Sequence, residues 1–253
     1  ALVPHHLIDV ADPDENYSVA RFVQMAQKSI QEITARGKLP ILVGGTGFYV
    51  QALLGDRPLA KIQEHPDPAF EEYWNQQVQR DGETTLRKTL AQVDPISAER
   101  ILPGQIRRLK RALLVSKQTG HPFSSLQPRP KRRYDAFIIG LNTERAYLYK
   151  RINQRVDSML ADGLLNEARL VYDLPAEATA KKAIGYKELF PYLAGEATLA
   201  QASEVLKTAS RHYAKRQLTW FKNQFTDIHW LDLIEKPDMV KPLTTEIKAF
   251  MSE

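Results

Sequence analysis

The sequence predicts an α/β protein in which a parallel-sheet core carries a mostly helical insertion domain. Two short apolar runs, at 40–43 and 136–141, are typical of buried strands, and each is followed by a helical pattern. Helix, short loop, buried strand and helix in succession indicate a parallel sheet. Residues 56–100 show helical patterns and no strand pattern. We therefore expect a core of residues 1–55 and 101–253, interrupted by a helical insertion at 56–100.

In residues 18–54, each predicted element begins or ends at a residue type that is typical of helix caps and breaks. Ser18 is a suitable N-cap for a helix that continues to Arg36, with apolar residues recurring on one side. Gly37 ends this helix, and Pro40 prevents its continuation. The apolar run at 40–43 then predicts a buried strand, and a glycine turn leads into a helix that continues to residue 54.

The remaining elements follow from periodicity and from glycine or proline stops. Asp81-Gly82 divides two helical segments between Phe70 and Leu90, and a short helix follows within DPISAERILP. Asn142 or Thr143 is a candidate cap for the helix after the second strand. Further on, we expect helices at 107–118, 142–161, 164–172, 200–223 and 247–251, and a last strand at 228–231.

The composition excludes several classes of protein. The chain has 253 residues, of which 43% are hydrophobic and 26% charged, as in globular proteins. No apolar run approaches the length of a membrane span, and no signal peptide is visible at the start. The chain has no cysteine, which excludes disulfides and thiolate metal sites and is compatible with a cytoplasmic location.

The positive charge is concentrated in two parts of the sequence. Residues 100–133 contain ten lysines and arginines and no acidic residue, and residues 207–222 contain five more, again without an acid. Clustered charge of one sign favours a polyanion partner, above all a nucleic acid. Phosphorylated small molecules, or solubility alone, are the alternatives.

The glycine turn and three basic groups are the candidate functional segments. Gly44, Gly45 and Thr46 open a helix after an apolar run, where N–H groups can bind a phosphate, although a plain turn is equally compatible with this spacing. Basic residues with nearby aromatic or hydroxyl groups suit single-stranded RNA. The three basic groups are Arg107, Arg108, Lys110 and Arg111, with Leu109 on the buried side; Lys181, Lys182, Tyr186 and Lys187 around Ala183, Ile184 and Gly185; and Arg211, Lys215, Arg216, Gln217, Thr219 and Lys222.

Several motifs with known chemistry are absent from the sequence. It has no G-x-x-x-x-G-K-[ST] phosphate loop, no G-x-G-x-x-G, no G-x-S-x-G and no Cys/His metal set. His5 and His6 are adjacent and would point to opposite faces of a strand, so a structural role is expected. Asp9, Asp12 and Asp14 are typical of a surface turn. We predict no metal site from protein residues alone.

Six segments resemble the tRNA dimethylallyltransferase (tRNA isopentenyltransferase) family, in the same order and at about family spacing: PHHLIDV, YSVARF, LVGGTGFYVQALL, RRLKRAL, AIGYKEL and YAKRQLTWFKN. The resemblance implies transfer of a dimethylallyl group from dimethylallyl diphosphate to the exocyclic amine of the adenosine 3′ to the anticodon, assisted by Mg²⁺. It also implies a fold like that of nucleotide- and ATP-binding P-loop kinases, with a helical insertion that contacts the tRNA anticodon stem-loop.

The resemblance carries specific roles to matching positions. Thr46 matches a threonine near the reacting centre and is the candidate catalytic residue, with Gly44 and Gly45 lining the same site. Arg151 and Arg155 match a basic helix near the diphosphate. The tRNA-binding candidates are Arg107, Arg108, Leu109, Lys110, Arg111, Lys182, Ala183, Ile184, Gly185, Tyr186, Lys187, Lys215, Arg216, Gln217, Thr219 and Lys222.

The sequence also departs from the family pattern. The family's phosphate loop and its proposed general base, an Asp of an early segment, have no counterpart here, so at least ~30 residues of a βαβ unit are expected to be missing. Glu71 occupies a position where the family often has an arginine. We therefore expect these 253 residues alone to be inactive, and the whole enzyme to be a monomer.

Two other functions stay open at this point. One is a prenyltransferase acting on adenylate or another nucleotide, or a small-molecule kinase of the same fold, neither of which needs so much basic surface. The other is a non-catalytic RNA-binding module, which the absence of a phosphate loop favours.

Overall fold

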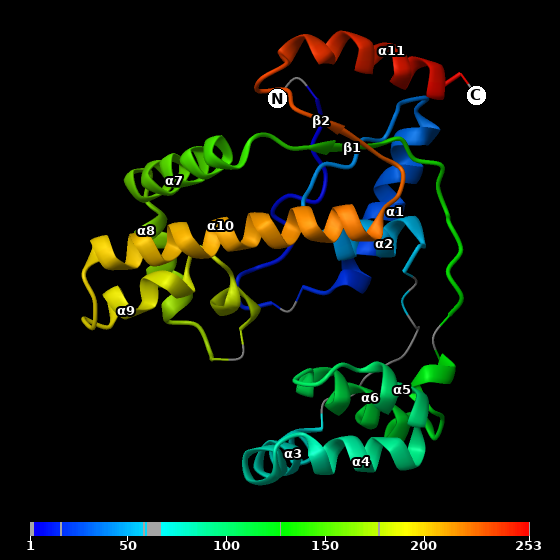
Figure 1. Cartoon of the computed structure of the whole chain (residues 1–253), viewed down its shortest axis with the longest axis vertical. Coiled ribbons are helices and arrows are strands. Elements are labelled where there is room, and N and C mark those ends of the chain that lie inside the picture. Colours follow the sequence, from blue (N-terminus) through cyan, green and yellow to red (C-terminus); the bar gives the residue numbers. More distant parts are fainter. Residues whose placement is uncertain are drawn as a thin grey trace. The chain divides into compact units, whose positions relative to one another are not determined.

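The computed structural model describes residues 3–15, 17–57, 59, 67–126, 128–176 and 178–252. The chain divides into two compact units (Figure 1). The first, here called the α/β unit, consists of Ala1–Leu53 and Arg133–Glu253. The second, the helical unit, is the continuous stretch Leu54–Arg132.

The α/β unit contains most of the helices and both described strands. The prediction of an α/β protein with a parallel sheet is therefore confirmed in outline. Its elements are α1 (Val19–Ala35), α2 (Gly47–Leu54), β1 (Ile138–Leu141), α7 (Arg145–Ala161), α8 (Leu164–Tyr172), η2 (Thr179–Lys182), η3 (Lys187–Leu189), α9 (Phe190–Leu193), α10 (Leu199–Gln224), β2 (Ile228–Leu231), η4 (Pro237–Met239) and α11 (Val240–Phe250).

The sheet in the described part of the chain is a parallel pair, β1 with β2, in which Ile138 lies opposite Ile228 and Leu141 opposite Leu231. Both strands were predicted from their apolar patterns. Their pairing joins segments about ninety residues apart, and parallel strands require such long crossover connections. Here the crossover consists of α7 to α10.

The predicted strand at 40–43 is not formed. Residues 38–44 have no regular secondary structure, and the side chains of Ile41 and Val43 are 75% and 89% exposed. A parallel strand is stabilised by ladder hydrogen bonds to a neighbour and by cover on both faces. The sequence pattern was apolar enough for a buried strand, but neither described strand pairs with this segment.

The crossover helices enclose an apolar cluster of their own. Val156 of α7, Leu164 and Ala168 of α8, Leu189 of η3 and Leu206 of α10 are each at most 7% exposed. Figure 1 shows α10, coloured from yellow to orange, extending alongside α7 and α9. The cluster fixes the position of α10, whose C-terminal half carries one of the predicted basic groups.

The helical unit consists of α3 (Pro68–Asp81), α4 (Thr84–Val93), α5 (Pro95–Arg100), α6 (Ile106–Thr119) and η1 (Phe123–Leu126). Its core contains Phe70 and Trp74 of α3, Leu86 and Leu90 of α4, and Leu109, Ala112, Leu113 and Leu114 of α6. The predicted domain boundary at residue 100 is therefore too early. The apolar side of α6 completes the core of the helices before it, and the unit continues to Arg132.

A buried carboxylate joins two parts of the helical unit. Asp94 has no exposed surface and is the N-cap of α5. One of its oxygens accepts the N–H of Ser97 at 3.0 Å and the hydroxyl of Ser124 at 2.7 Å, and the other accepts the N–H of Ser124 at 2.8 Å. Burial raises the pKa of the Asp94 carboxyl, but these hydrogen bonds outweigh it and hold the pKa below its usual value.

Candidate functional site

The glycine turn begins α2. The carbonyl oxygen of Thr46 accepts the N–H groups of Tyr49 and Val50 at 2.9 and 3.2 Å, so Thr46 starts the helical hydrogen-bond pattern. Its side chain is exposed. The hydroxyl is therefore available to a ligand at the N-terminal end of α2, where the helix dipole is positive.

Helix α10 packs directly against this turn. The side-chain Nε2 of Gln217 donates a hydrogen bond to the carbonyl of Gly45 at 2.8 Å. One turn farther, a Cβ atom on Gly47 would lie 2.2 Å from Cδ1 of Trp220, so only glycine permits this approach. The structure thus brings together two of the segments singled out in the sequence, the glycine turn and the basic part of α10, and assigns Gln217 to the contact between them.

Gly47→Ala is expected to lower the free energy of unfolding by about 1–3 kcal/mol, because the added methyl group overlaps a rigid indole ring. Urea denaturation measures the change. Gly44→Ala is the matched control, since a Cβ there meets nothing within 4 Å and its stability should stay within about 0.5 kcal/mol of the wild type. Equal stability of the two variants would contradict the packing described here.

The cationic side chains of α10 on both sides of Gln217 in the sequence are directed to the surface. Lys215, Arg216 and Lys222 are exposed. The Nζ atom of Lys222 lies 5.7 Å from the centroid of the Trp230 ring. The hydroxyl of Thr219 donates to the carbonyl of Lys215 at 2.9 Å, so its proton is used within the helix. All three cations thus lie exposed on the helix that packs against the turn.

Arg151 and Arg155 lie on α7, which is attached to α10 by polar contacts. Arg211 donates from Nη1 to the Oδ1 atom of Asn153 at 2.7 Å, and Lys207 pairs with Asp157 at 2.8 Å. Arg151 and Arg155 themselves are exposed, and within the described residues neither forms an ion pair. Their charges are open to an anion, and their helix is fixed by the contacts with α10.

In the segment 182–187, the lysines are exposed and the residues between them are structural. Gly185 adopts a φ of +115°, and its N–H donates to the buried carboxylate of Glu188 at 3.0 Å. Ile184 and Tyr186 pack against the apolar cluster of the crossover helices. Burial raises the pKa of the Tyr186 hydroxyl, as does Glu167, which accepts its hydrogen bond at 3.2 Å. Ala183 is partly buried, which leaves Lys182 and Lys187 as the surface of this segment.

The basic group on α6 is divided between surface and core. Arg107, Arg108 and Arg111 are exposed, whereas Leu109 has no exposed surface and Lys110 is only 8% exposed. The ammonium group of Lys110 pairs with Glu71 of α3 and donates to Asn75 at 2.9 Å. The charge of Lys110 is therefore neutralised inside the unit.

Sequence reasoning did not identify the partners of Lys110. We grouped Lys110 with Arg107 and Arg111 as one basic face, but its side chain connects α6 to α3. A signal for this pairing existed, because Glu71 and Asn75 are four residues apart and share one face of a predicted helix.

A cavity of about 530 Å³ in the helical unit was also not predicted. We call it the α3–α6 cavity. Aromatic residues of α3 form much of its wall. The adjacent aromatic residues Tyr73 and Trp74 could have indicated this cavity from the sequence. It is lined by Asp67, Ala69, Phe70, Tyr73, Trp74, Thr89, Val93, Leu113, Ser116 and Lys117.

The described ranges contain neither a cluster of metal-binding side chains nor a helix suited to crossing a membrane. No three His, Asp or Glu side chains there are grouped so that they could hold a metal ion. No described helix combines the length and the apolar character that crossing a membrane requires.

Comparison with known proteins places the chain in a family. Residues 1–224 match the family described as IPP transferase. The tRNA dimethylallyltransferase of Limosilactobacillus fermentum is 46% identical over 255 residues, covering 100% of this chain and 82% of the relative. That of Latilactobacillus sakei is 48% identical over 237 residues, covering 93% of this chain and 76% of the relative.

Solved structures agree with these relatives. The tRNA isopentenylpyrophosphate transferase of Bacillus halodurans superposes with a TM-score of 0.66 at 40% identity, covering 98% of this chain and 78% of that chain. A eukaryotic dimethylallyltransferase acting on tRNA gives a TM-score of 0.78 at 27% identity, covering 98% and 66%. The exposed basic residues and the glycine turn thus occur in a chain that belongs to the IPP transferase family, together with the tRNA dimethylallyltransferases.

Proposed function

We propose that this chain transfers a dimethylallyl group from dimethylallyl diphosphate to the exocyclic amine of the adenosine 3′ to the anticodon in tRNA, and that the glycine turn and α10 form part of the reacting site. The family supports the reaction. The observation that supports the site is the exposed Thr46 hydroxyl, held at the start of α2 by the packing of α10 on Gly45 and Gly47.

Prenyl transfer makes three demands on a protein. The C–O bond to the diphosphate breaks as the C–N bond to the adenine amine forms, and the leaving charge needs positive groups and N–H donors. The adenine must leave its stack, which favours a loop over a duplex. Water must be excluded from the allylic carbon. The amine finally loses a proton, for which we assign no base among these residues.

The exposed groups divide between these demands. Thr46, at the positive end of α2, serves the reacting centre. Arg151 and Arg155, which form no ion pair within the described ranges, carry charge suited to the diphosphate. The tRNA backbone is bound by the exposed cations of α6, α10 and the 182–187 segment. The less exposed residues of the same segments hold these surfaces in place: Leu109, Lys110, Gly185 and Gln217.

Mg²⁺, a monomeric state and a sheet like that of P-loop kinases belong to the same proposal. For the sheet, the support is the parallel pairing of β1 with β2. For Mg²⁺, the described residues do not fit a dedicated protein site. We therefore assign no step to the metal.

The experiment uses residues 1–253 alone and residues 1–253 joined to a phosphate-loop unit from a family member. Each is incubated with labelled dimethylallyl diphosphate and either an anticodon stem-loop or AMP. We expect the joined chain to label the stem-loop, not AMP, and not a stem-loop with guanosine in place of the adenosine. Equal labelling of AMP would instead identify an adenylate prenyltransferase.

Residues 1–253 alone are expected to bind the stem-loop without turnover, because their sequence contains no phosphate-loop motif. Labelling by this chain at the rate of the joined chain would place every catalytic group within the 253 residues. The proposed function would be overturned if both chains failed to label the stem-loop and failed to bind it.

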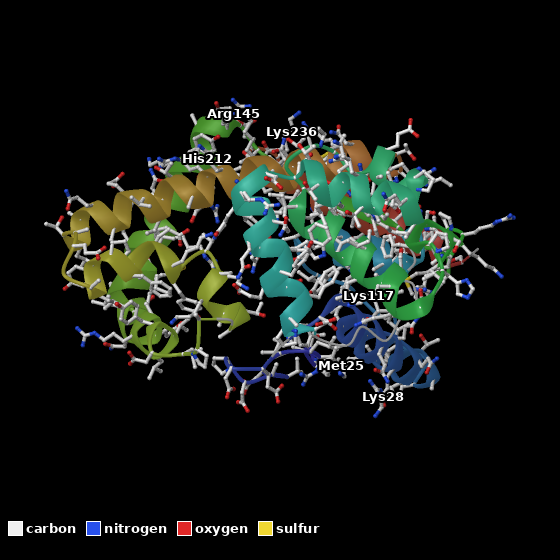
Figure 2. All side chains as sticks on the ribbon, turned by 90° about the horizontal axis from the view of Figure 1, so that it is seen from below. Met25, Lys28, Lys117, Arg145, His212 and Lys236 are labelled. Atoms are coloured by element: carbon white, nitrogen blue, oxygen red, sulfur yellow. The ribbon has the colours of Figure 1, made fainter. Side chains whose placement is uncertain are left out.

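Arg108→Ala on α6 and Lys215→Ala on α10 are each expected to weaken stem-loop binding and to lower the salt slope by roughly 0.7–0.9 per lost phosphate contact. The slope is measured by titration at several salt concentrations. Lys28→Ala is the control, since Lys28 lies on α1 with 79% of its side chain exposed (Figure 2). If the slope stayed at the wild-type value in both variants, these cations would not contact phosphate.

A further inference from the structure

The α3–α6 cavity has an aromatic wall with one exposed ring. Tyr73 is 53% exposed, whereas its neighbour Trp74 is only 6% exposed. The two rings meet edge to face, with centroids 5.1 Å apart and an interplanar angle of 84°. Trp74 is fixed in the core of the unit, so it holds the Tyr73 ring in place from one side. A large aromatic ring that is supported but half uncovered is a platform on which another flat ring can stack.

A cation lies beside this aromatic wall. Lys117 lines the cavity, and its Nζ atom is 5.6 Å from the centroid of the Phe70 ring (Lys117 is labelled in Figure 2). Its only ion pair in the described residues is with Asp67, at 3.4 Å, and 62% of the side chain is exposed. An exposed ion pair of this kind contributes little to stability. Lys117 can therefore leave Asp67 and pair with another anion at a small cost in free energy. The cavity therefore combines an apolar slot with an exposed positive charge.

The charge of the whole unit indicates which partner fits this slot. The helical unit has 14 lysines and arginines against nine acidic residues, whereas the α/β unit has 21 of each. The entire net charge of +5 is thus carried by the helical unit. A partner attracted to it is a polyanion, and an apolar slot beside a cation suits a polyanion whose repeating unit carries an aromatic ring next to a phosphate.

We propose that the α3–α6 cavity binds a single unpaired nucleobase of the RNA substrate, stacked on Tyr73, with the adjacent phosphate on Lys117. The inference rests on the proposed function insofar as RNA is the substrate. It adds a second base-binding position on the helical unit, separate from the adenosine that reacts. A cavity of about 530 Å³ is within the range of small-ligand sites and is large enough for one base. A duplex cannot supply such a base, because its rings are stacked on one another.

The test measures binding of residues 1–253 to an anticodon stem-loop and to a fully paired duplex. Tyr73→Ala is expected to weaken stem-loop binding about tenfold, the effect of one lost base–aromatic stack, and to leave duplex binding unchanged. Tyr73→Phe keeps the ring and should bind within about twofold of the wild type. Ile96→Ala, which removes a 53% exposed apolar side chain of the same unit outside the cavity, is the matched control.

Two further measurements locate the base and the phosphate. 2-Aminopurine is placed at each loop position in turn, and one position should lose fluorescence on binding, an effect that Tyr73→Leu abolishes. Lys117→Ala should lower the salt slope by roughly 0.7. Lys88→Ala, on the exposed surface of α4 and outside the cavity, should leave the salt slope unchanged. Thermal unfolding of each variant confirms that it is folded.

The inference is overturned if Tyr73→Ala binds the stem-loop as Ile96→Ala does, or if it weakens duplex binding equally. Its failure is distinguishable from failure of the proposed function. Transfer to the stem-loop by the joined chain without dependence on Tyr73 overturns the cavity and retains the function. Binding that depends on Tyr73, without transfer by the joined chain, retains the cavity and overturns the function.

Discussion

Thr46→Ala is expected to lower the rate of dimethylallyl transfer about 100-fold in the chain that joins residues 1–253 to a phosphate loop. The reason is geometric. The carbonyl of Thr46 accepts the first hydrogen bonds of α2, so its side chain is held at a fixed point beside the positive end of that helix. A hydroxyl in that position can align a reacting group without reorganisation. Single-turnover kinetics with saturating stem-loop measure the effect on the chemical step.

Thr46→Ser is the control, because it retains the hydroxyl and should keep most of the rate. Stem-loop affinity of Thr46→Ala should stay close to that of the wild type, since the loss is expected in kcat and not in binding. An unchanged kcat in Thr46→Ala would place the hydroxyl outside the reacting centre. A loss confined to affinity would make Thr46 a binding residue only.

Asp94→Ala is expected to lower the free energy of unfolding of the helical unit by about 3 kcal/mol. The carboxylate caps α5 and binds Ser124 of η1, so alanine removes a helix cap and leaves several buried donors without an acceptor. Trp74 is the only tryptophan of the unit. Its fluorescence during urea denaturation, in a background in which Trp220 and Trp230 are replaced by phenylalanine, measures this unit alone.

The stability of the helical unit should also depend on pH through Asp94. Its folded-state pKa is lower than the value of about 3.9 usual for an unfolded chain, so its contribution is fully present above that value. It is lost as the pH falls from there through the lowered pKa. Asp94→Asn, which keeps the shape but cannot titrate, should lack this part of the acid dependence. Parallel pH profiles for the two proteins would contradict the role of the carboxylate.

Sequence signals predicted the parts of the fold that are decided locally. Ser18 caps α1 by accepting the N–H of Arg21 at 3.2 Å, as expected from its type and position. Gly120 adopts the left-handed conformation that ends α6. The bounds of α8 and of β2 were also evident from the apolar pattern, and β1 (Ile138–Leu141) lies within the predicted run 136–141. The helix caps and ends depend on interactions within about one helical turn.

The features that the sequence did not reveal depend on distant partners. The run at 40–43 has a strand composition, but a strand forms only where another backbone pairs with it. The domain boundary was misplaced because the apolar side of α6 does not indicate which helices it covers. Lys110 was assigned to a surface because its carboxylate partner, Glu71, is 39 residues away. For the candidate site, the residue types were visible in the sequence, but the contact of α10 with the turn was not.

The division of the α/β unit along the chain has a consequence for the order of folding during synthesis. The helical unit is continuous, so it can fold as soon as residue 132 has left the ribosome. The α/β unit cannot, because the contact between Gly45 and Gln217 closes a separation of 172 residues. The nascent chain therefore presents a folded basic unit before the glycine turn acquires its support. Premature termination between α6 and α10 would release a product that contains the helical unit but lacks the contact of Gln217 with the glycine turn.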